Sequence, residues 1–200
     1  HLKPILRTYT VAAFDPVLNL LSVDFVMHGD NGPASKWAHH AEVGSSIGLA
    51  GPGGPDLFQA NADWFVLAGD LSALAAIRAV LSQLPKDARG YTFIEVDNLL
   101  EHQSLPHPTH MHISWLNRKH SPAGRSQLLL QAIQNMPWLE GQASVTIAGE
   151  SAQVVLIRDY LRMDKNISRD MMYAVPYWKD EQTEEEYHQE RHRIMDELEA

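Results

Sequence analysis

Residues 28–38 read His28-Gly29-Asp30-Asn31-Gly32-Pro33-Ala34-Ser35-Lys36-Trp37-Ala38. The segment combines a glycine-rich turn with a hydroxyl residue, at the point where a helix is expected to begin. The first N–H groups of a helix have no partner inside the helix, and the helix dipole is positive at this end. Such a turn therefore favours an anion, for example a phosphate group. In isolation, the same residues are also typical of a turn with an N-cap that binds nothing.

A second polar run, Arg7-Thr8-Tyr9-Thr10, precedes this turn in the sequence. It places a cation, a flat phenol and a hydroxyl on one short extended segment, as the binding of an isoalloxazine ring and a phosphate would require. On its own, the run is more often an ordinary half-buried strand. The order and spacing of the two segments together indicate a flavin site.

The two segments resemble those of the siderophore-interacting proteins, which are ferric-siderophore reductases of the ferredoxin-reductase superfamily. The resemblance covers essentially the whole chain. It implies that FAD is the cofactor and that FAD is held mainly by the polar run and by the turn of residues 32–35. The complete set of cofactor-binding residues that we predict is Arg7, Tyr9, Thr10, His28, Gly32, Pro33, Ala34, Ser35, Trp37, Asp70, Ser72 and Trp178.

The resemblance also implies a reaction, the FAD-dependent reduction of a ferric siderophore that releases Fe(II) for iron assimilation. The flavin carries the chemistry, so no catalytic side chain is expected. The electron donor is NAD(P)H or reduced ferredoxin, and ferredoxin is thus a possible partner beside the ferric siderophore. Two alternatives stay open: a general flavin reductase or electron-transfer flavoprotein, and a siderophore-binding module without turnover.

Composition limits the classes to which this protein can belong. The chain has 200 residues, no cysteine and a formal net charge of −9. The absence of cysteine excludes disulfides and thiolate chemistry, and the acidic balance argues against nucleic-acid binding. No segment reaches the ~20 apolar residues of a membrane span, so a cytoplasmic protein without membrane contact is expected. The histidine clusters do not have metal-site spacing, and no metal is expected; they are His39 and His40, and His102, His107, His110 and His112.

The resemblance predicts three parts. Residues 1–55 are expected to form part of an antiparallel FAD-binding barrel. Because the chain enters the flavin-binding run almost at once, the barrel's N-terminal strands are expected to be missing. Residues 56–175 are expected to form a parallel-sheet α/β domain like an NAD(P)H domain, and residues 176–200 a C-terminal extension with a helix.

Apolar strands that alternate with helical segments support the α/β domain. In the first part, strands are expected over residues 18–27 and 46–51. In the second part, strands are expected over residues 64–68, 91–96, 112–116 and 144–148, and helices over residues 73–84, 124–136 and 152–163. This alternation is typical of a parallel sheet covered on both faces, with ligands beyond the carboxyl ends of its strands.

The turn Gly69-Asp70-Leu71-Ser72 follows the first of these strands. Asp70 could accept a hydrogen bond from a ribose or cap the next helix. The family commonly has an acid where this chain has Leu71 and a proline where it has Ala75, and the usual glycine-rich nicotinamide fingerprint is missing. Glu150, at a second glycine turn, is compatible with a helix-terminal charge or with a binding role.

The C-terminal region contains Tyr177-Trp178-Lys179, which resembles a family segment that returns toward the flavin. Because an acidic protein repels anionic ferric siderophores, a local cation is needed to attract them. Lys179 is the leading candidate, and Lys36 and Arg162 are weaker ones. From Thr183 onward the sequence predicts an amphipathic helix that docks by its apolar side.

Overall fold

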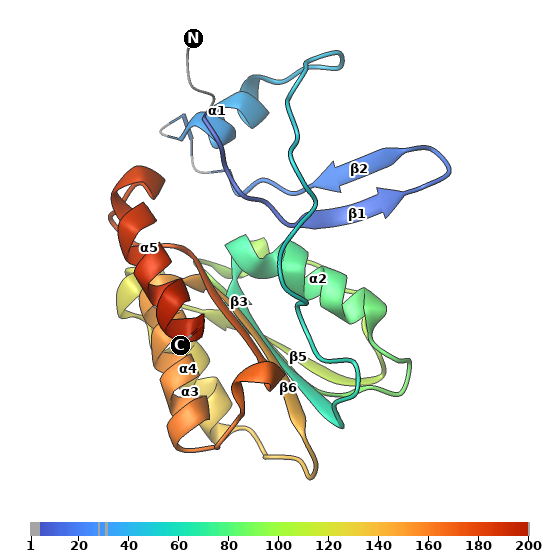
Figure 1. The fold of residues 1–200 in the computed structure, drawn as a ribbon, viewed down its shortest axis with the longest axis vertical. Coiled ribbons are helices and arrows are strands. Elements are labelled where there is room, and N and C mark those ends of the chain that lie inside the picture. Colours follow the sequence, from blue (N-terminus) through green and yellow to red (C-terminus); the bar gives the residue numbers. More distant parts are fainter. Residues whose placement is uncertain (1–4, 28, 31, 200) are drawn as a thin grey trace. The chain divides into compact units, whose positions relative to one another are not determined.

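The computed structural model describes residues 5–27, 29–30 and 32–199. The chain forms two compact units, residues 1–55 and residues 56–200 (Figure 1). Among the described residues, no helix combines the length and the apolar composition that crossing a membrane would need.

The first unit contains an antiparallel hairpin and one helix. Strand β1 (Val11–Asp15) pairs with β2 (Leu20–Val23), and α1 spans Pro33–His40. The Asp15 carboxylate accepts hydrogen bonds from the backbone N–H groups of residues 17 and 18, at 2.8 and 3.0 Å, and so closes the turn between the strands.

Two strand predictions for this unit differ from the structure. The hairpin turn uses residues 18 and 19, with Asn19 at a positive φ of 51°, so the strand predicted over residues 18–27 is confined to β2. The Arg7–Thr10 run has no assigned secondary structure and directly precedes β1. Residues 46–51 have no regular secondary structure.

The second unit is built on a five-stranded, entirely parallel sheet in the order β5-β4-β3-β6-β7. Its strands are β3 (Trp64–Asp70), β4 (Arg89–Val96), β5 (His110–Asn117), β6 (Ala143–Glu150) and β7 (Met172–Trp178). Its α-helices are α2 (Leu74–Gln83), α3 (Leu128–Asn135), α4 (Ser151–Met163) and α5 (Glu184–Glu199). Short 3₁₀ helices span residues 71–73, 99–101, 123–125 and 169–171.

The core lies on both faces of this sheet, as β3 shows. Phe65 and Leu67 pack on the face that α2 covers, whereas Trp64, Val66 and Ala68 pack on the face of α3 and α4 (Figure 1). A strand that is buried on both faces has to be apolar throughout, which explains its unbroken apolar sequence. The predicted parallel sheet covered on both faces is confirmed.

Two elements differ from the sequence predictions for this unit. The helix predicted from residue 124 begins only at Leu128, because residues 123–125 form a separate 3₁₀ turn. Strand β7 was missed, since Pro176 lies inside it and proline is typical only of edge strands. Strand β7 is indeed at one edge of the sheet.

Candidate functional site

The N-terminus of α1 carries the turn that the sequence predicts to bind an anion. Its N-cap residue is Gly32, Pro33 occupies the first turn, and among the described residues no side chain caps the helix and no acidic residue lies in its first turn. The side chain of Ser35 is buried, and its hydroxyl donates to the carbonyl oxygen of Gly29 at 2.8 Å. This hydrogen bond ties Ser35 to Gly29, and the first helical turn is the end of α1 whose dipole favours an anion.

An aromatic cluster in the same unit joins two predicted flavin residues. The rings of Tyr9 and Phe25 lie 4.7 Å apart, and those of Phe25 and Trp37 lie 5.9 Å apart, measured between centroids. Tyr9 is 40% exposed, so this cluster offers an aromatic surface to solvent. Phe25 was not predicted as a site residue, although it lies in an alternating apolar pattern with Val23.

The other predicted flavin residues of this unit are placed as follows. Arg7 donates from Nη1 to the carbonyl oxygen of Leu6 at 2.8 Å, and Thr10 directly precedes β1. Ala34 lies in the first turn of α1. His28 lies outside the described residues.

In the second unit, Asp70 connects two other residues that were predicted as cofactor ligands, Ser72 and Trp178. One carboxylate oxygen accepts hydrogen bonds from the backbone N–H and the hydroxyl of Ser72, at 2.8 and 2.5 Å. The other accepts from Trp178 Nε1 at 2.8 Å and from the Glu150 backbone N–H at 2.9 Å. Asp70 is only 5% exposed and caps the 3₁₀ helix that begins at Leu71. The capping alternative for Asp70 is therefore the one that the structure displays.

Gly149 allows this close approach between β3 and β6. Its φ is +134°, and a Cβ at this position would lie 2.6 Å from the Asp70 carboxylate oxygen. Only glycine combines this backbone conformation with the absence of a side chain.

Two further carboxylates lie buried where β4 and β6 end. Glu95 accepts hydrogen bonds from the Ser126 hydroxyl at 2.5 Å and from Gln153 Nε2 at 3.1 Å. Glu150 caps α4 by accepting from the backbone N–H groups of residues 152 and 153. Burial raises the pKa of both carboxyl groups above the ordinary value. We call the end of the sheet that carries Asp70, Glu95 and Glu150 the carboxyl edge.

We expect the substitution Glu95→Gln to flatten the dependence of stability on pH. Because the pKa of Glu95 is raised by folding, the native state binds more protons than the unfolded state, and stability falls as pH rises through the folded pKa. Glutamine keeps an acceptor for Gln153 and can donate to Ser126, but it cannot ionise. The measurement is the free energy of unfolding by urea between about pH 5 and about pH 8. The stability of the variant relative to that of the wild type should increase as pH rises.

The control for this measurement is Glu140→Gln, which removes an exposed carboxylate. Its difference from the wild type should be small across the same pH range. If the stability of Glu95→Gln depended on pH in the same way as that of the wild type does, this would contradict a raised pKa for Glu95.

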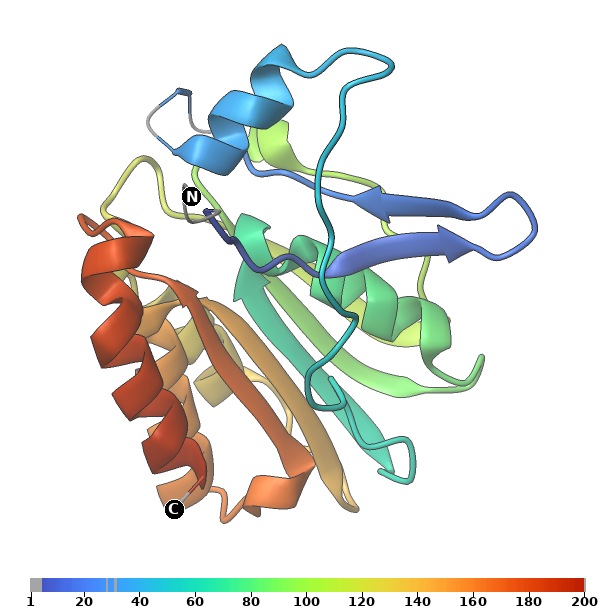
Figure 2. The same cartoon turned by 45° about the horizontal axis from the view of Figure 1, so that its top comes forward.

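Lys179, the leading candidate for binding the substrate, forms an ion pair within the chain. Its Nζ donates to both carboxylate oxygens of Glu190, at 2.7 and 2.6 Å, and lies 6.0 Å from the centroid of the Tyr187 ring. Helix α5 runs beside α4 (Figure 2), and the Tyr187 hydroxyl donates to Ser151 Oγ at 2.8 Å. Tyr187 and Ile194 are buried, so α5 docks by its apolar side as predicted.

The two weaker candidates for binding the substrate do not lie beside Lys179 in the second unit. Arg162 is exposed in the last turn of α4. Lys179 lies near Tyr187, which is hydrogen-bonded to Ser151 at the first residue of the same helix. Because an α-helix rises by about 1.5 Å per residue, the length of α4 keeps Arg162 away from Lys179. Lys36 lies in the first unit on α1 and is exposed.

Histidines gather at one point in the first unit. Asp30 Oδ1 lies 3.2 Å from His39 Nδ1, and Asp30 Oδ2 lies 3.3 Å from His40 Nε2. Hydrogen bonds from His39 and then His40 lower the pKa of Asp30. Asp30 lies nine and ten residues before the two histidines, a separation that gives no sequence signal for their contact.

Histidines of residues 102–112 contact aromatic rings or the backbone. His102 packs on Trp115, His112 packs on Tyr91, and His107 Nδ1 lies 2.6 Å from the carbonyl oxygen of Leu105.

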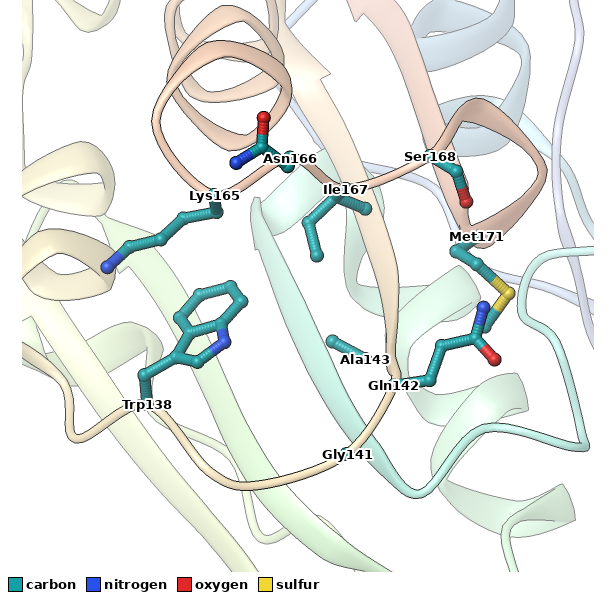
Figure 3. A pocket seen from close by; sticks show the side chains of 9 residues that line it. All are labelled: Trp138, Gly141, Gln142, Ala143, Lys165, Asn166, Ile167, Ser168 and Met171. Carbon is teal, nitrogen blue, oxygen red and sulfur yellow. The ribbon is translucent and has the colours of Figure 1, made fainter.

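A pocket of about 220 Å³ is lined by Ala143, the first residue of β6, and by the loop after α4 (Figure 3). Because Ala143 begins β6 and Glu150 ends it, the pocket lies at the other end of the sheet from the carboxyl edge. The Lys165 ammonium lies 4.9 Å from the centroid of the Trp138 ring at its rim. No predicted site residue lines this pocket.

Comparison with known families gives a match over most of the chain. Residues 1–56 match the model of the siderophore-interacting FAD-binding domain, and residues 62–181 match the model of the siderophore-interacting protein.

Individual relatives agree with these matches. The chain is 45% identical to the ferric vibriobactin reductase ViuB of Vibrio cholerae over 197 residues, which are 98% of this chain and 72% of the relative. It is 30% identical to the ferric acinetobactin reductase of Acinetobacter baumannii over 182 residues, which are 89% of this chain and 62% of the relative.

Solved structures show the same similarity. The siderophore-interacting protein SipS from Aeromonas hydrophila superimposes with a TM-score of 0.85 at 35% identity, covering 97% of this chain and 76% of that one. The siderophore-interacting protein from Acinetobacter baumannii gives a TM-score of 0.84 at 28% identity, covering 98% and 78%.

Proposed function

From the premise that this chain belongs to the siderophore-interacting protein family, we propose that it is an FAD-dependent ferric-siderophore reductase. It reduces Fe(III) held by a siderophore and so releases Fe(II) for iron assimilation. The observation that carries the proposal is the glycine–proline N-terminus of α1, whose first turn holds no acidic residue and can receive the FAD pyrophosphate. Relatives named as ferric vibriobactin and ferric acinetobactin reductases support the reaction.

The residues of the first unit suit FAD chemically. The backbone N–H groups at residues 34 and 35, which follow Pro33, and the cation of Arg7 would hold the phosphates, and Tyr9 and Trp37 would offer aromatic surface to the rings. FAD, when bound, supplies the chemistry because it accepts electron pairs and passes electrons singly to Fe(III). The side chains orient it and exclude water. We infer that the β1–β2 hairpin is part of an antiparallel flavin-binding barrel, with residues 56–175 and 176–200 as the α/β domain and its extension.

The carboxyl edge favours reduced ferredoxin over NAD(P)H as the electron donor. Glu150 already caps α4, and Asp70 caps the 3₁₀ helix before α2. Both helix N-termini at the usual nucleotide position are thus occupied by the chain's own carboxylates, which repel a pyrophosphate. We also propose a cytoplasmic location, where both types of donor would be supplied.

The proposal is tested with the purified protein and FAD. We expect visible flavin absorbance, anaerobic flavin reduction that is faster with reduced ferredoxin than with NADH or NADPH, and capture of Fe(II) by a ferrous chelator when a ferric siderophore is added. Absence of flavin binding would favour the non-catalytic siderophore-binding module. Flavin reduction without faster Fe(II) release than free reduced flavin gives would favour the general flavin reductase.

We expect Glu190, which lies on α5, to weaken the attraction of Lys179 for anionic ferric chelates. The Lys179 and Glu190 side chains are 29% and 33% exposed, so their ion pair is worth about 1 kcal/mol or less. Glu190→Gln frees the Lys179 charge, and we expect it to lower KM for an anionic ferric chelate by a factor of about two to five. The measurement is KM at several salt concentrations, and the effect should shrink as salt rises.

Two controls accompany this prediction. Glu140→Gln removes a negative charge from another exposed site and should leave KM nearly unchanged. An equal change in KM for a neutral ferric chelate would show that Lys179 does not act through charge.

A further inference from the structure

We propose that Asp30, His39 and His40 form a binding site for a divalent first-row transition-metal ion. Asp30 comes from the turn before α1, and the two histidines come from its last turn. Among the described residues, this is the one group of three or more potential ligands whose ligand atoms all lie within 4.8 Å of one another.

The distances within the group already approach those of a metal site. The oxygens of Asp30 lie 3.2 and 3.3 Å from the ring nitrogens of His39 and His40. Ligand atoms about 2.0 to 2.2 Å from a tetrahedral ion are separated from one another by about 3.3 Å. An ion could therefore replace the protons that now join these atoms, with only small movements of the three side chains.

The chemistry of the group selects the class of ion. Two neutral imidazoles and one carboxylate suit Fe(II), Ni(II) and Zn(II), whereas Mg(II) and Ca(II) prefer oxygen ligands alone. The side chains of Asp30, His39 and His40 are 49%, 61% and 62% exposed, so water can fill the remaining coordination positions. Exposure also makes the site open and of modest affinity.

The site has a natural occupant if the protein is a reductase. Fe(II), the product of the proposed reaction, belongs to the class of ions that this group selects, so naming Fe(II) rests on the proposed function. Metal binding itself does not, because it needs neither reduction nor a siderophore. Failure of the reductase assay would consequently leave the metal site standing.

The test is calorimetric titration of the flavin-loaded protein with Zn²⁺. A second pair, His188 and His192, lies one helical turn apart on α5 with ring centroids 4.4 Å apart, and could also bind Zn²⁺. His192→Gln removes that pair and serves as the background. In this background we expect one Zn²⁺ site, whose affinity Asp30→Asn weakens at least about tenfold and the double change His39→Asn with His40→Asn abolishes.

A local readout guards against variants that disturb the turn. In the His192→Gln protein, Zn²⁺ should shift the ring NMR signals of His39 and His40, identified by the single His→Asn variants, but not that of His102. Zn²⁺ affinity that is unchanged by Asp30→Asn, or signals of His39 and His40 that do not move, would overturn the metal site. Anaerobic Fe²⁺ should broaden the same two signals, and sharp signals would overturn Fe(II) as the occupant.

Discussion

Replacing Asp70 with alanine is expected to lower the free energy of unfolding by about 3 to 5 kcal/mol. The four hydrogen bonds that Asp70 accepts come from Ser72, Glu150 and Trp178, which lie on three different segments of the chain. Alanine leaves these donors without an acceptor in a site that is only 5% exposed. Unfolding by urea, followed by far-UV circular dichroism at a fixed FAD concentration, measures the loss.

Two further variants separate the carboxylate from mere volume. Asp70→Asn keeps the shape but turns one acceptor into a donor, so one of its partners then faces another donor, and we expect an intermediate loss. Asp87→Ala changes an exposed aspartate after α2 and should lie within about 0.5 kcal/mol of the wild type. If Asp70→Ala were no worse than Asp87→Ala, Asp70 would not hold the carboxyl edge together.

The sheet of the second unit could be predicted because burial on both faces forces an unbroken apolar sequence. Residues 64–68 show this directly in the central strand β3, whereas in β6 the buried Ser144 and Thr146 alternate with apolar residues. The edge strand β7 carries Pro176 and is less completely buried, so its sequence gives no such signal.

The contacts of the site could be predicted less well because they join residues that are distant in the sequence. Resemblance to the family selected Asp70, Ser72 and Trp178, but their hydrogen bonds to one another span as many as 108 residues. Their role as cofactor ligands remains a prediction.

Charge pairing was the other feature that sequence alone did not indicate. Lys179 was chosen for its cation, yet Glu190 is an equally ordinary residue of an acidic helix until α5 packs beside α4. Likewise, Asp30 is within hydrogen-bonding distance of His39 and His40 only once the chain has folded.

Replacing Arg7 with alanine is expected to weaken FAD binding by a factor of about ten to one hundred. The proposed contact is a charge-assisted hydrogen bond to a phosphate, which is worth about 1.5 to 3 kcal/mol. The measurement is the dissociation constant of FAD, obtained by titrating the flavin-free protein and following flavin fluorescence.

The form of the proposed contact can be tested with two matched variants. Arg7→Lys keeps the positive charge but loses the planar fork of the guanidinium, so its FAD affinity should fall between those of the wild type and Arg7→Ala. Arg125→Ala removes an exposed cation from the second unit and controls for the change in net charge. If Arg7 acts through a phosphate, only the Arg7 variants should lose affinity, and the loss should diminish in high salt. A folded Arg7→Ala protein with wild-type FAD affinity would show that the N-terminus of α1 holds the phosphates without this cation.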